Sequence, residues 1–388
     1  MARLGDVCTI VSGTTPKSSC PEYWDGDINW VTPAELNNES DVIYESQRKI
    51  TKQAVIDSSL KPFPAGTVLL SSRAPIGKVA IAGTEMYCNQ GFKNLICSDL
   101  VYNRYLYHFL KSQTKYLNSL GRGATFKEIS KSIVEEIEIP LPCLEKQHRI
   151  AALLDKVSDL IAKRRAQLDK LDLLVKARFV EMFGDLAAPE CPHKKCKLVE
   201  TCVSSDDIKC GPFGTQLSKE EYQDHGVAVW EIPQINSYFT TQPTHFLTVE
   251  KAEQLKAYSI IPGDIAMSRK GNVGRCALFP DNFDSGIIHS DVLRIRVDKQ
   301  QVNPCFMMYQ LHFSGAVQRQ IEVVSSGAIM AGVNVTKLKH IEIHLPDFDL
   351  QQQFAHFVGE VDRVKYSINN SLEKLETLKK ALMQQYFG

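Results

Sequence analysis

The sequence contains one structural plan twice, and this repetition constrains the fold more than any other feature. The end of each half aligns without a gap, at a constant offset of 204 residues, so that Pro142 and Gly184 match Pro346 and Gly388. Two copies are too few for a solenoid, which needs three or more stacked units to bury its core. We therefore expect two related domains that form a pseudo-two-fold pair.

The earlier parts of the two halves align with small insertions. The matching segments are Arg3-Leu4 with Lys197-Leu198, Trp30-Val31-Thr32-Pro33 with Trp230-Glu231-Ile232-Pro233, Pro64 to Val68 with Ile261 to Ile265, Ser72-Arg73 with Ser268-Arg269, and Gly77-Lys78 with Gly274-Arg275. Each copy thus has an apolar run entered through a Gly turn and a second run that returns after another Gly. This pattern predicts a β-hairpin in each half.

Each half ends in a long stretch with apolar residues at 4-3 spacing, which is typical of a heptad seam. The seam residues are Ile150, Leu154, Val157, Ile161, Leu168, Leu171 and Val175 in the first half, and Phe354, Val358, Val361, Ile368, Leu372, Leu375 and Leu382 in the second. Roughly 40 residues form a rod about 60 Å long. A small domain cannot bury such a seam alone, so we expect the two helices to pack on each other. Two unrelated core helices are the alternative.

The predicted fold class is α+β, with two mixed α/β domains joined by two long antiparallel coiled-coil-like helices. The domains are placed at residues 1–142 and 185–346, and the helices at 143–184 and 347–388. In the mixed domains, alternating segments such as Ile137-Glu138-Ile139 predict strands.

Charge and composition exclude several classes of protein. Lys plus Arg and Asp plus Glu are both 45, and the hydrophobic fraction is 44%. The zero net charge counts against non-specific coating of nucleic acid, although a basic face can be balanced elsewhere. No apolar stretch reaches the ~18 residues of a membrane helix, and the N-terminal residues have no apolar signal region. The 11 cysteines are scattered, so we expect reduced thiols in a cytoplasm and no association with membranes.

The sequence has no complete catalytic motif. A Walker lysine motif, a Gly-x-Ser-x-Gly elbow and a His-Glu-x-x-His pair are all absent. The segment Asn303-Pro304-Cys305-Phe306 is similar to the Asn-Pro-Pro-aromatic motif of amino-methyltransferases. Because no Gly-rich cofactor loop accompanies it, we interpret it as the start of a helix. No catalytic residue is therefore predicted.

A thiol-rich patch lies near the junction of the halves and contains Cys191, His193, Cys196 and Cys202. Cys and His are zinc ligands, but the spacing differs from a standard pair of Cys-x-x-Cys knuckles, and the first half has no counterpart. Free thiols in a linker are the favoured interpretation, and binding of a metal by this patch stays an open question.

Basic and amide-rich loops recur in both halves and are the candidate DNA-binding sites. They contain Arg73, Lys78, Gln90, Lys93, Arg122 and Lys127 in the first half, and Arg269, Lys270, Arg275, Asn334 and Lys337 in the second. The segment Asn89 to Lys93 lies opposite His289 to Val292, and Gly121 to Lys127 lies opposite Ser325 to Ala328. Arg and Lys can contact phosphates or guanine, and Asn and Gln can contact adenine. Solvated turns are the alternative for each loop taken singly.

In this order and repeated twice, the motifs resemble the specificity subunit of type I restriction–modification systems. The resemblance rests on Arg3 to Val7, Trp30 to Pro33, the Gly66 and Ser72-Arg73 hairpin, Asn89 to Phe92, and Ile137 to Pro142 leading into Gln147. It covers essentially the whole chain. The second copy is looser, since Pro140 is replaced by His344 and Asn89 to Phe92 by His289 to Val292, and this implies that it reads a different sequence.

The resemblance implies a non-catalytic subunit whose two target-recognition domains each read half of a bipartite, asymmetric site in double-stranded DNA. The two helices would act as spacers and dock two modification (methyltransferase) subunits, which bind S-adenosylmethionine. Restriction subunits that use ATP would join them, so this chain would bind neither cofactor itself. A stand-alone adenine methyltransferase and a coiled-coil scaffold without nucleic acid are the alternatives.

Overall fold

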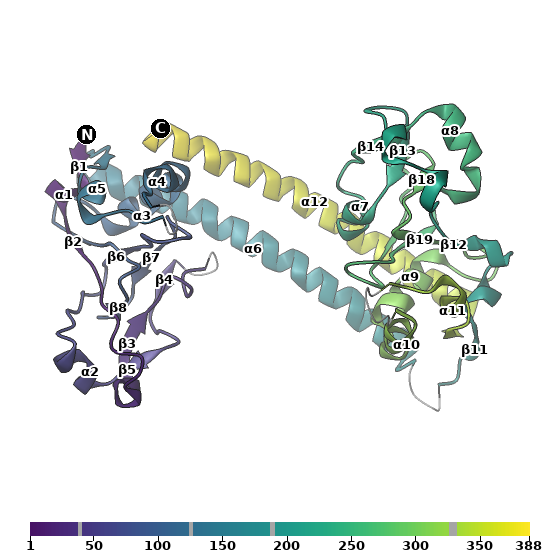
Figure 1. Ribbon diagram of the computed structural model, residues 1–388, viewed down its shortest axis with the longest axis horizontal. Coiled ribbons are helices and arrows are strands. Elements are labelled where there is room, and N and C mark those ends of the chain that lie inside the picture. Colours follow the sequence, from purple (N-terminus) through teal and green to yellow (C-terminus); the bar gives the residue numbers. More distant parts are fainter. Residues whose placement is uncertain (38–40, 124–126, 187–190, 326–331) are drawn as a thin grey trace. The chain divides into compact units, whose positions relative to one another are not determined.

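The computed structural model divides the chain into two compact units, each described separately below (Figure 1). Unit 1 comprises Met1–Gln167 and Ser367–Gly388, and unit 2 comprises Leu168–Tyr366. The residues that the structure describes are 1–37, 41–123, 127–186, 191–325 and 332–388. Among them, no helix is both long and apolar enough to cross a membrane.

The described residues of unit 1 form three small sheets beside helices. Its strands are β1 Ala2–Arg3, β2 Cys8–Val11, β3 Trp24–Val31, β4 Val42–Ile43, β5 Lys49–Ile50, β6 Val68–Leu70, β7 Val79–Ala82, β8 Tyr87–Cys88, β9 Asn94–Cys97 and β10 Glu138–Ile139. Its shorter helices are α1 Leu4–Val7, the 3₁₀ helix η1 Pro21–Tyr23, α2 Lys52–Asp57, α3 Asn103–Ser112, α4 Thr114–Leu120 and α5 Lys131–Glu135. The strand orders are β2-β9-β6-β7-β4, β5-β3-β8 and β1-β10. The main core lies between the largest sheet, α3 and the start of the first long helix.

Unit 2 repeats this plan. Its strands are β11 Lys194–Lys197, β12 Ile208–Cys210, β13 Val227–Trp230, β14 His245–Leu247, β15 Ser259–Ile260, β16 Ile265–Ser268, β17 Cys276–Leu278, β18 Gly286–Ile288, β19 Val292–Ile295 and β20 Glu342–Leu345. Its shorter helices are η2 Leu198–Thr201, η3 Ser205–Asp207, η4 Gly214–Gln216, η5 Lys219–Glu221, α7 Ile232–Asn236, α8 Val249–Gln254, η6 Lys256–Tyr258, α9 Pro304–Phe313, α10 Gly315–Ser325 and α11 Val335–Leu338. The strand orders are β12-β19-β16-β17, β14-β13-β18-β15 and β11-β20.

The hydrogen bonds of the backbone confirm that the two units are copies. The amide of Leu4 donates to Ile137 at 2.8 Å, and the amide of Leu198 donates to Ile341 at 3.0 Å. Gly66 and Gly263, which enter the predicted hairpins, have φ angles of 85° and 87°. Glycine is required here because this left-handed conformation is unfavourable for residues with a Cβ atom. The predicted hairpins are confirmed as β6–β7 and β16–β17, which pair antiparallel.

The predicted match of Trp30 with Trp230 is wrong by one residue. The amide of Asn89 donates to the carbonyl of Val31, whereas the amide of the equivalent His289 donates to the carbonyl of Trp230. Val31 and Trp230 are therefore equivalent, and each packs in its copy against the sheet that contains the hairpin. Trp30 lies on the opposite face of its strand, because a shift of one residue reverses the direction of a side chain.

The predicted match of Ser72-Arg73 with Ser268-Arg269 is also wrong by one residue. The amide of Ser71 donates to Lys78 at 2.9 Å, and that of Ser268 donates to Arg275 at 2.8 Å. Ser71 is thus equivalent to Ser268, and Arg73 is equivalent to Lys270. The hairpin loops of the two units have equal lengths, so positions correspond one to one through each loop. The Ser-Arg dipeptide of each unit therefore stands at a different position, and its occurrence in both is coincidental.

The two long helices have nearly the predicted bounds. The first, α6, spans Leu144–Phe183, and the second, α12, spans Phe348–Phe387. In unit 1 the start of α6 packs against the end of α12, and in unit 2 the end of α6 packs against the start of α12. The predicted antiparallel pairing of the seams is therefore confirmed. The seam residues are buried except Leu168, Leu171, Leu372, Leu375 and Leu382, which are half-buried.

A buried glutamine ties each long helix to the domain before it. In α6, the Gln147 side chain accepts from the amide of Tyr102 at 2.9 Å and donates to the carbonyls of Leu100 (3.0 Å) and Pro142 (2.8 Å). In α12, Gln351 accepts from the amide of Asn303 at 2.9 Å and donates to the carbonyls of Gln301 (3.4 Å) and Pro346 (2.7 Å), which are the equivalent segments of unit 2. Both side chains are fully buried. A glutamine suits this position because one amide can satisfy a donor and two acceptors at once.

Candidate nucleic-acid interface

The hairpin of unit 1 presents an arginine that is held by a partly buried ion pair beneath it. Arg73 follows β6, and its Nε donates to Oε2 of Glu128 at 2.9 Å. The other carboxylate oxygen, Oε1, accepts from Nζ of Lys93 at 3.1 Å. The Lys93 side chain is only 9% exposed, whereas that of Arg73 is 45% exposed. Arg73 is therefore the solvent-facing member of a fixed triad.

The triad keeps Glu128 ionised. Its partial burial acts to raise the pKa of the carboxyl, but the hydrogen bonds and charges of Lys93 and Arg73 outweigh this and lower it. Glu128 therefore remains a carboxylate at neutral pH and orients the guanidinium of Arg73. Lys93, predicted as a DNA contact, lies behind this carboxylate.

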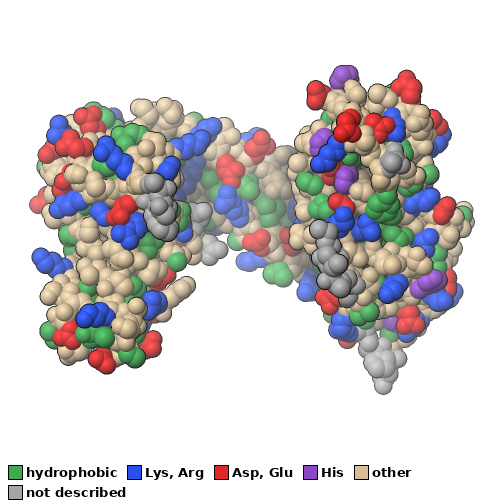
Figure 2. Space-filling view, in the orientation of Figure 1, with side chains coloured by type: hydrophobic (Ala, Val, Ile, Leu, Met, Phe, Trp, Pro, Cys, Tyr) green, Lys and Arg blue, Asp and Glu red, His purple; other side chains and the backbone are tan. Residues whose placement is uncertain are grey.

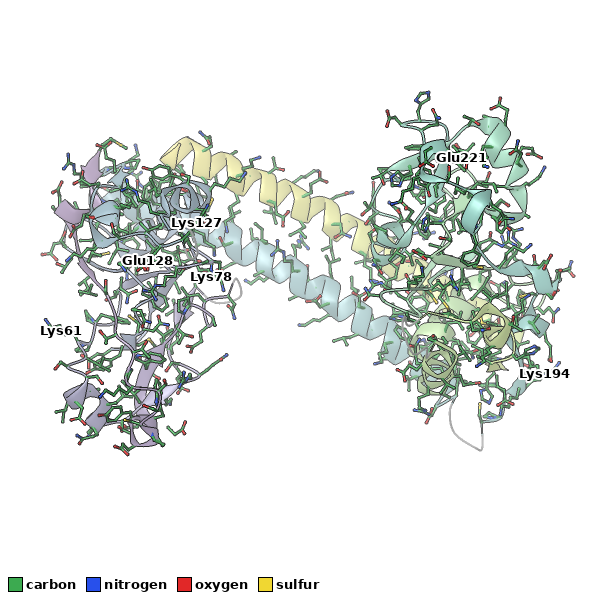
Figure 3. All side chains as sticks on the ribbon, viewed as in Figure 1. Lys61, Lys78, Lys127, Glu128, Lys194 and Glu221 are labelled. Atoms are coloured by element: carbon green, nitrogen blue, oxygen red, sulfur yellow. The ribbon has the colours of Figure 1, made fainter. Side chains whose placement is uncertain are left out.

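The other candidates of unit 1 surround the same hairpin. The Nζ atom of Lys78 donates to the carbonyl of Pro33 at 3.3 Å, and the side-chain oxygen of Gln90 accepts from the Thr15 hydroxyl. Arg122 and Lys127 are exposed, and the backbone of Arg122 pairs with that of Glu128. Figure 3 shows Lys78, Lys127 and Glu128 in the same region of unit 1. Residues 124–126, which the sequence places in this loop, lie outside the described residues.

The hairpin of unit 2 holds its cations by different contacts. Lys270 pairs with Asp291, with 2.8 Å between Nζ and Oδ1. The guanidinium of Arg269 lies 4.8 Å from the centre of the Phe213 ring, and its Nε donates to the carbonyl of Val333 at 3.2 Å. These contacts fix both side chains next to the hairpin loop.

Arg275 of unit 2 directly precedes β17, the second strand of the hairpin. It donates to the carbonyl of Asn236 at 2.9 Å, and its guanidinium lies 5.0 Å from the centre of the Tyr238 ring. Its Nε is buried and has no hydrogen-bond partner among the described atoms. Arg275 is thus half-buried and positioned by an aromatic ring.

The two units place an ion pair at the same point of the hairpin but take the acid from different segments. Arg73 and Lys270 are equivalent. Glu128 is equivalent to Gly332, because the residues that follow them, Ile129 and Val333, donate equivalent backbone hydrogen bonds to the hairpin. Asp291 instead lies in the turn before β19. Sequence reasoning missed both acids, although Glu128 directly follows the candidate Lys127.

The predicted correspondence of Asn89 with His289 is confirmed. The Oδ1 atom of Asn89 accepts from the amide of Gly91 at 2.9 Å, and Nδ1 of His289 accepts from the amide of Asp291 at 3.2 Å. A different side chain thus closes the same turn in each unit. The turns are fixed next to the hairpins, because Ser72 donates to Gly91 and Arg269 to Asp291.

Two further candidates of unit 2 lie at a helix N-terminus. Asn334 is the N-cap of α11, and its Oδ1 accepts from the amide of Lys337 at 3.0 Å. Ser130 caps α5 of unit 1 at the equivalent position. Asn334 and Lys337 are both exposed. The loop residues Ser326 to Ala328, which the sequence matches with this region, lie outside the described residues.

The structure also describes the Asn303 motif and the thiol-rich patch. Asn303 is the N-cap of α9, where Oδ1 accepts from the amides of Cys305 and Phe306 at 2.9 and 3.3 Å. The predicted helix start is therefore confirmed. Within the described ranges, the structure has no group of three His, Cys, Asp or Glu side chains that could hold a metal ion. This includes the thiol-rich patch of Cys191, His193, Cys196 and Cys202.

Charge is interspersed on the face of the molecule that Figure 2 shows, where Lys and Arg side chains lie among Asp and Glu. This agrees with the equal numbers of basic and acidic residues. Such a surface favours individually positioned contacts over attraction by a broad basic patch.

Comparison with known proteins agrees with the repeated architecture. Residues 1–171 and 209–380 match the family described as Type I restriction modification DNA specificity domain. The MjaIX specificity subunit of Methanocaldococcus jannaschii is 42% identical over 186 residues, which are 47% of this chain and 43% of that protein. The MjaVIII specificity subunit of the same organism is 22% identical over 99% of this chain and 90% of its own.

Solved structures share the fold. The S subunit of a type I restriction–modification system from M. genitalium has a TM-score of 0.61 at 16% identity, and the match covers 100% of this chain and 95% of that one. A chain from a study of complex assembly in the type I system has a TM-score of 0.60 at 19% identity, with 100% and 96% covered. With two matching stretches that together span most of its length, the chain belongs to the type I restriction modification DNA specificity domain family.

Proposed function

We propose that this chain is the sequence-specific DNA-binding subunit of a type I restriction–modification complex and reads a bipartite, asymmetric site. Each unit reads one half-site through its hairpin and the neighbouring turn. The observation that carries the proposal is the positioned cation at the same point in both copies, Arg73 beside Glu128 and Lys270 beside Asp291. A cation held in this way loses little freedom when it contacts a phosphate or a base.

The partners are two modification (methyltransferase) subunits and the restriction subunits, which dock on the two long helices. Apolar side chains exposed along these helices support this role, because isolated helices in water do not favour them. They are Leu144, Leu153, Leu160, Leu173, Leu174 and Val180 on α6, and Val364, Tyr366 and Leu378 on α12. S-adenosylmethionine for methylation and the ATP used in restriction bind to the partners, and the complex works in the cytoplasm of a bacterium or archaeon.

The chain itself is non-catalytic in this proposal. Asn303, the residue that favoured a stand-alone methyltransferase, uses its side-chain oxygen to cap α9, and its Nδ2 donates to Gln352 at 2.9 Å. An asparagine engaged on both sides is not free to hold a target amino group. Binding of labelled S-adenosylmethionine to the pure chain tests this point, and saturable binding would contradict it.

A salt series with duplex DNA tests the assignment of the hairpins. The site is first selected from a randomised duplex library with the complex. We expect Arg73→Ala and Lys270→Ala each to weaken binding. If the side chain contacts a phosphate, the slope of log affinity against log salt concentration should fall by about one. If it contacts a base, the variant should lose about 1–3 kcal/mol of binding free energy and the specificity for one base pair. Lys61→Ala and Lys194→Ala are matched controls. Figure 3 shows Lys61 away from Lys78 of the hairpin, and the exposed Lys194 lies in β11, which pairs with β20 and not with the hairpin strands. Wild-type affinity and slope in both hairpin variants would remove these loops from the interface.

Exchange of a whole domain tests the assignment of one half-site to each unit. Residues 185–346 are replaced by the corresponding domain of a relative, and the methylated positions are mapped in the host genome. We expect one half of the recognised sequence to change. A change in both halves would show that the domains do not read independently.

A further inference from the structure

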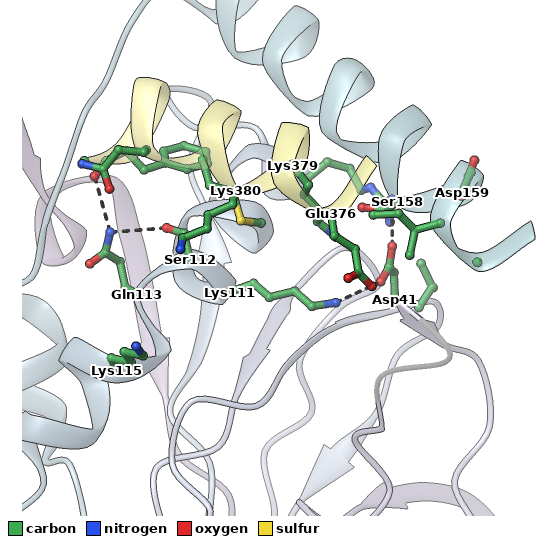
Figure 4. A pocket seen from close by; sticks show the side chains of 18 of the residues that line it. Asp41, Lys111, Ser112, Gln113, Lys115, Ser158, Asp159, Glu376, Lys379 and Lys380 are labelled. Carbon is green, nitrogen blue, oxygen red and sulfur yellow. Dashed lines mark hydrogen bonds and ion pairs between the residues drawn. The ribbon is translucent and has the colours of Figure 1, made fainter. Parts of the chain in front are cut away.

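Unit 1 contains a cavity of about 990 Å³ that takes no part in the proposed reading of DNA. Its walls are formed by the segment at Asp41–Tyr44, the end of α3, the start of α4, the middle of α6 and the end of α12 (Figure 4). This volume is that of a typical small-molecule pocket. The hairpin residues Arg73, Lys78 and Lys127 are not among those that line it.

The walls of the cavity carry more positive than negative side chains. The cations are Arg104, Lys111, Lys115, Arg165, Lys379 and Lys380, and the acids are Asp41, Asp159 and Glu376. Three of the cations have acidic partners in this cavity, since Arg165 pairs with Glu376 (2.6 Å) and both Arg104 and Lys111 pair with Asp41 (3.3 and 3.6 Å). The lysines at 115, 379 and 380 form no ion pair with any described residue.

Lys379 is the most informative of these lysines. It is half-buried and belongs to the wall formed by α12. Burial lowers its pKa, and the charges of Lys111 and Arg165 lower it further, whereas those of Asp41 and Asp155 act in the opposite direction. A half-buried ammonium group without an ion-pair partner among the described residues has lost part of its hydration, and a bound anion would compensate for that loss.

The second copy shows that the fold does not require a cation at the position of Lys379. The constant offset of 204 residues makes Lys379 equivalent to Val175 and Met383 equivalent to Phe179. Val175 is 1% exposed, and the ring of Phe179 packs against Phe313 and Phe354, with ring centres 5.8 and 5.4 Å apart. Unit 2 therefore has a buried apolar side chain at the position where unit 1 has Lys379.

We propose that this cavity binds a small anion with two or more linked phosphate groups, supplied either by a nucleotide or by free polyphosphate. Phosphate oxygens accept hydrogen bonds from ammonium groups, and three unpaired lysines match a ligand of several negative charges. Ile161, Met383 and Tyr44 also line the cavity and offer an apolar surface to a nucleoside. This inference is independent of the proposed DNA binding.

Calorimetric titration of the full-length chain at fixed ionic strength tests the proposal with sodium tripolyphosphate, ATP and adenosine. We expect saturable binding of tripolyphosphate and ATP and none of adenosine. Tighter binding of ATP than of tripolyphosphate identifies a nucleotide as the source, and equal affinities identify free polyphosphate. Lys379→Gln should weaken binding by about tenfold or more, because it removes a charge-assisted contact.

Two further variants keep this test decisive. Lys379→Val introduces the residue found at the equivalent buried position of unit 2, so we expect it to fold and yet to lose binding. Lys374→Gln removes an exposed charge of the same helix outside the cavity and should leave the affinity unchanged. The proposal is overturned if neither anion saturates the wild type, if Lys374→Gln and Lys379→Gln weaken binding equally, or if only a short DNA duplex binds there.

Discussion

Replacement of Gln147 by leucine should destabilise unit 1 severely, although it changes neither charge nor much volume. The side chain is fully buried and makes three hydrogen bonds to backbone groups of two segments. A hydrogen bond contributes about 0.5–1.5 kcal/mol net, and a buried group left unpaired costs about 1–3 kcal/mol. Loss of all three should therefore reduce the free energy of unfolding by about 3–6 kcal/mol, a large part of the stability of a domain.

Urea denaturation followed by circular dichroism measures this loss. With a slope of about 1–3 kcal/mol per molar urea, a loss of 3 kcal/mol lowers the midpoint of the transition by at least about 1 M. Gln351→Leu should produce a similar shift in unit 2, because its contacts repeat those of Gln147. Gln353→Leu, at an exposed position of α12, is the control and should change stability by less than about 0.5 kcal/mol. A Gln147→Leu variant as stable as this control would refute the reasoning.

Three other perturbations test separate parts of the molecule. Glu128→Gln should weaken specific DNA binding several-fold because Arg73 loses its anchor, and unchanged affinity in a binding titration would contradict the triad. Burial lowers the pKa of His108 despite its 2.6 Å contact with Asp155, so the unfolded chain binds a proton first and the melting temperature should fall as pH drops below about 6.5. His108→Asn should flatten that dependence, and an equally steep profile would exclude His108 as its source. Insertion of four residues between Arg164 and Leu168 lengthens α6 by about 6 Å. Site selection from a randomised duplex library should then give a gap that is wider by nearly two base pairs between unchanged half-sites. Full affinity with an unchanged gap would show that the partners set the spacing.

The repeat, the hairpins and the long helices could be predicted from the sequence because they depend on local periodicity. The 4-3 spacing specifies a helix and its buried face regardless of what the rest of the chain does. Matching of single residues was less reliable. Trp30 and Trp230 are both buried, in the equivalent strands β3 and β13, yet their side chains lie on opposite faces of these strands. Only the backbone hydrogen bonds reveal this shift of one residue.

The contacts of the candidate site could not be predicted in the same way. Lys93 and Arg73 converge on Glu128, 35 and 55 residues further along the chain, and no local pattern encodes a contact at that separation. The sequence therefore predicted charged residues for the region but could not separate Arg73, which faces solvent, from Lys93, which lies beneath its carboxylate.

The division of each long helix between two units has a consequence for the order in which the chain can fold. Unit 2 is continuous from Leu168 to Tyr366, whereas unit 1 is completed only by Ser367–Gly388. During synthesis, the first 167 residues must wait for the whole of unit 2 before Phe387 can pack against Tyr105 and Phe109. Until then the apolar face of Ile150 and Leu154 is only partly covered. The nascent chain thus carries an unfinished core for about 200 residues of elongation, or some 10–40 s at typical rates, and unit 2 rather than unit 1 is the first part able to reach its final structure.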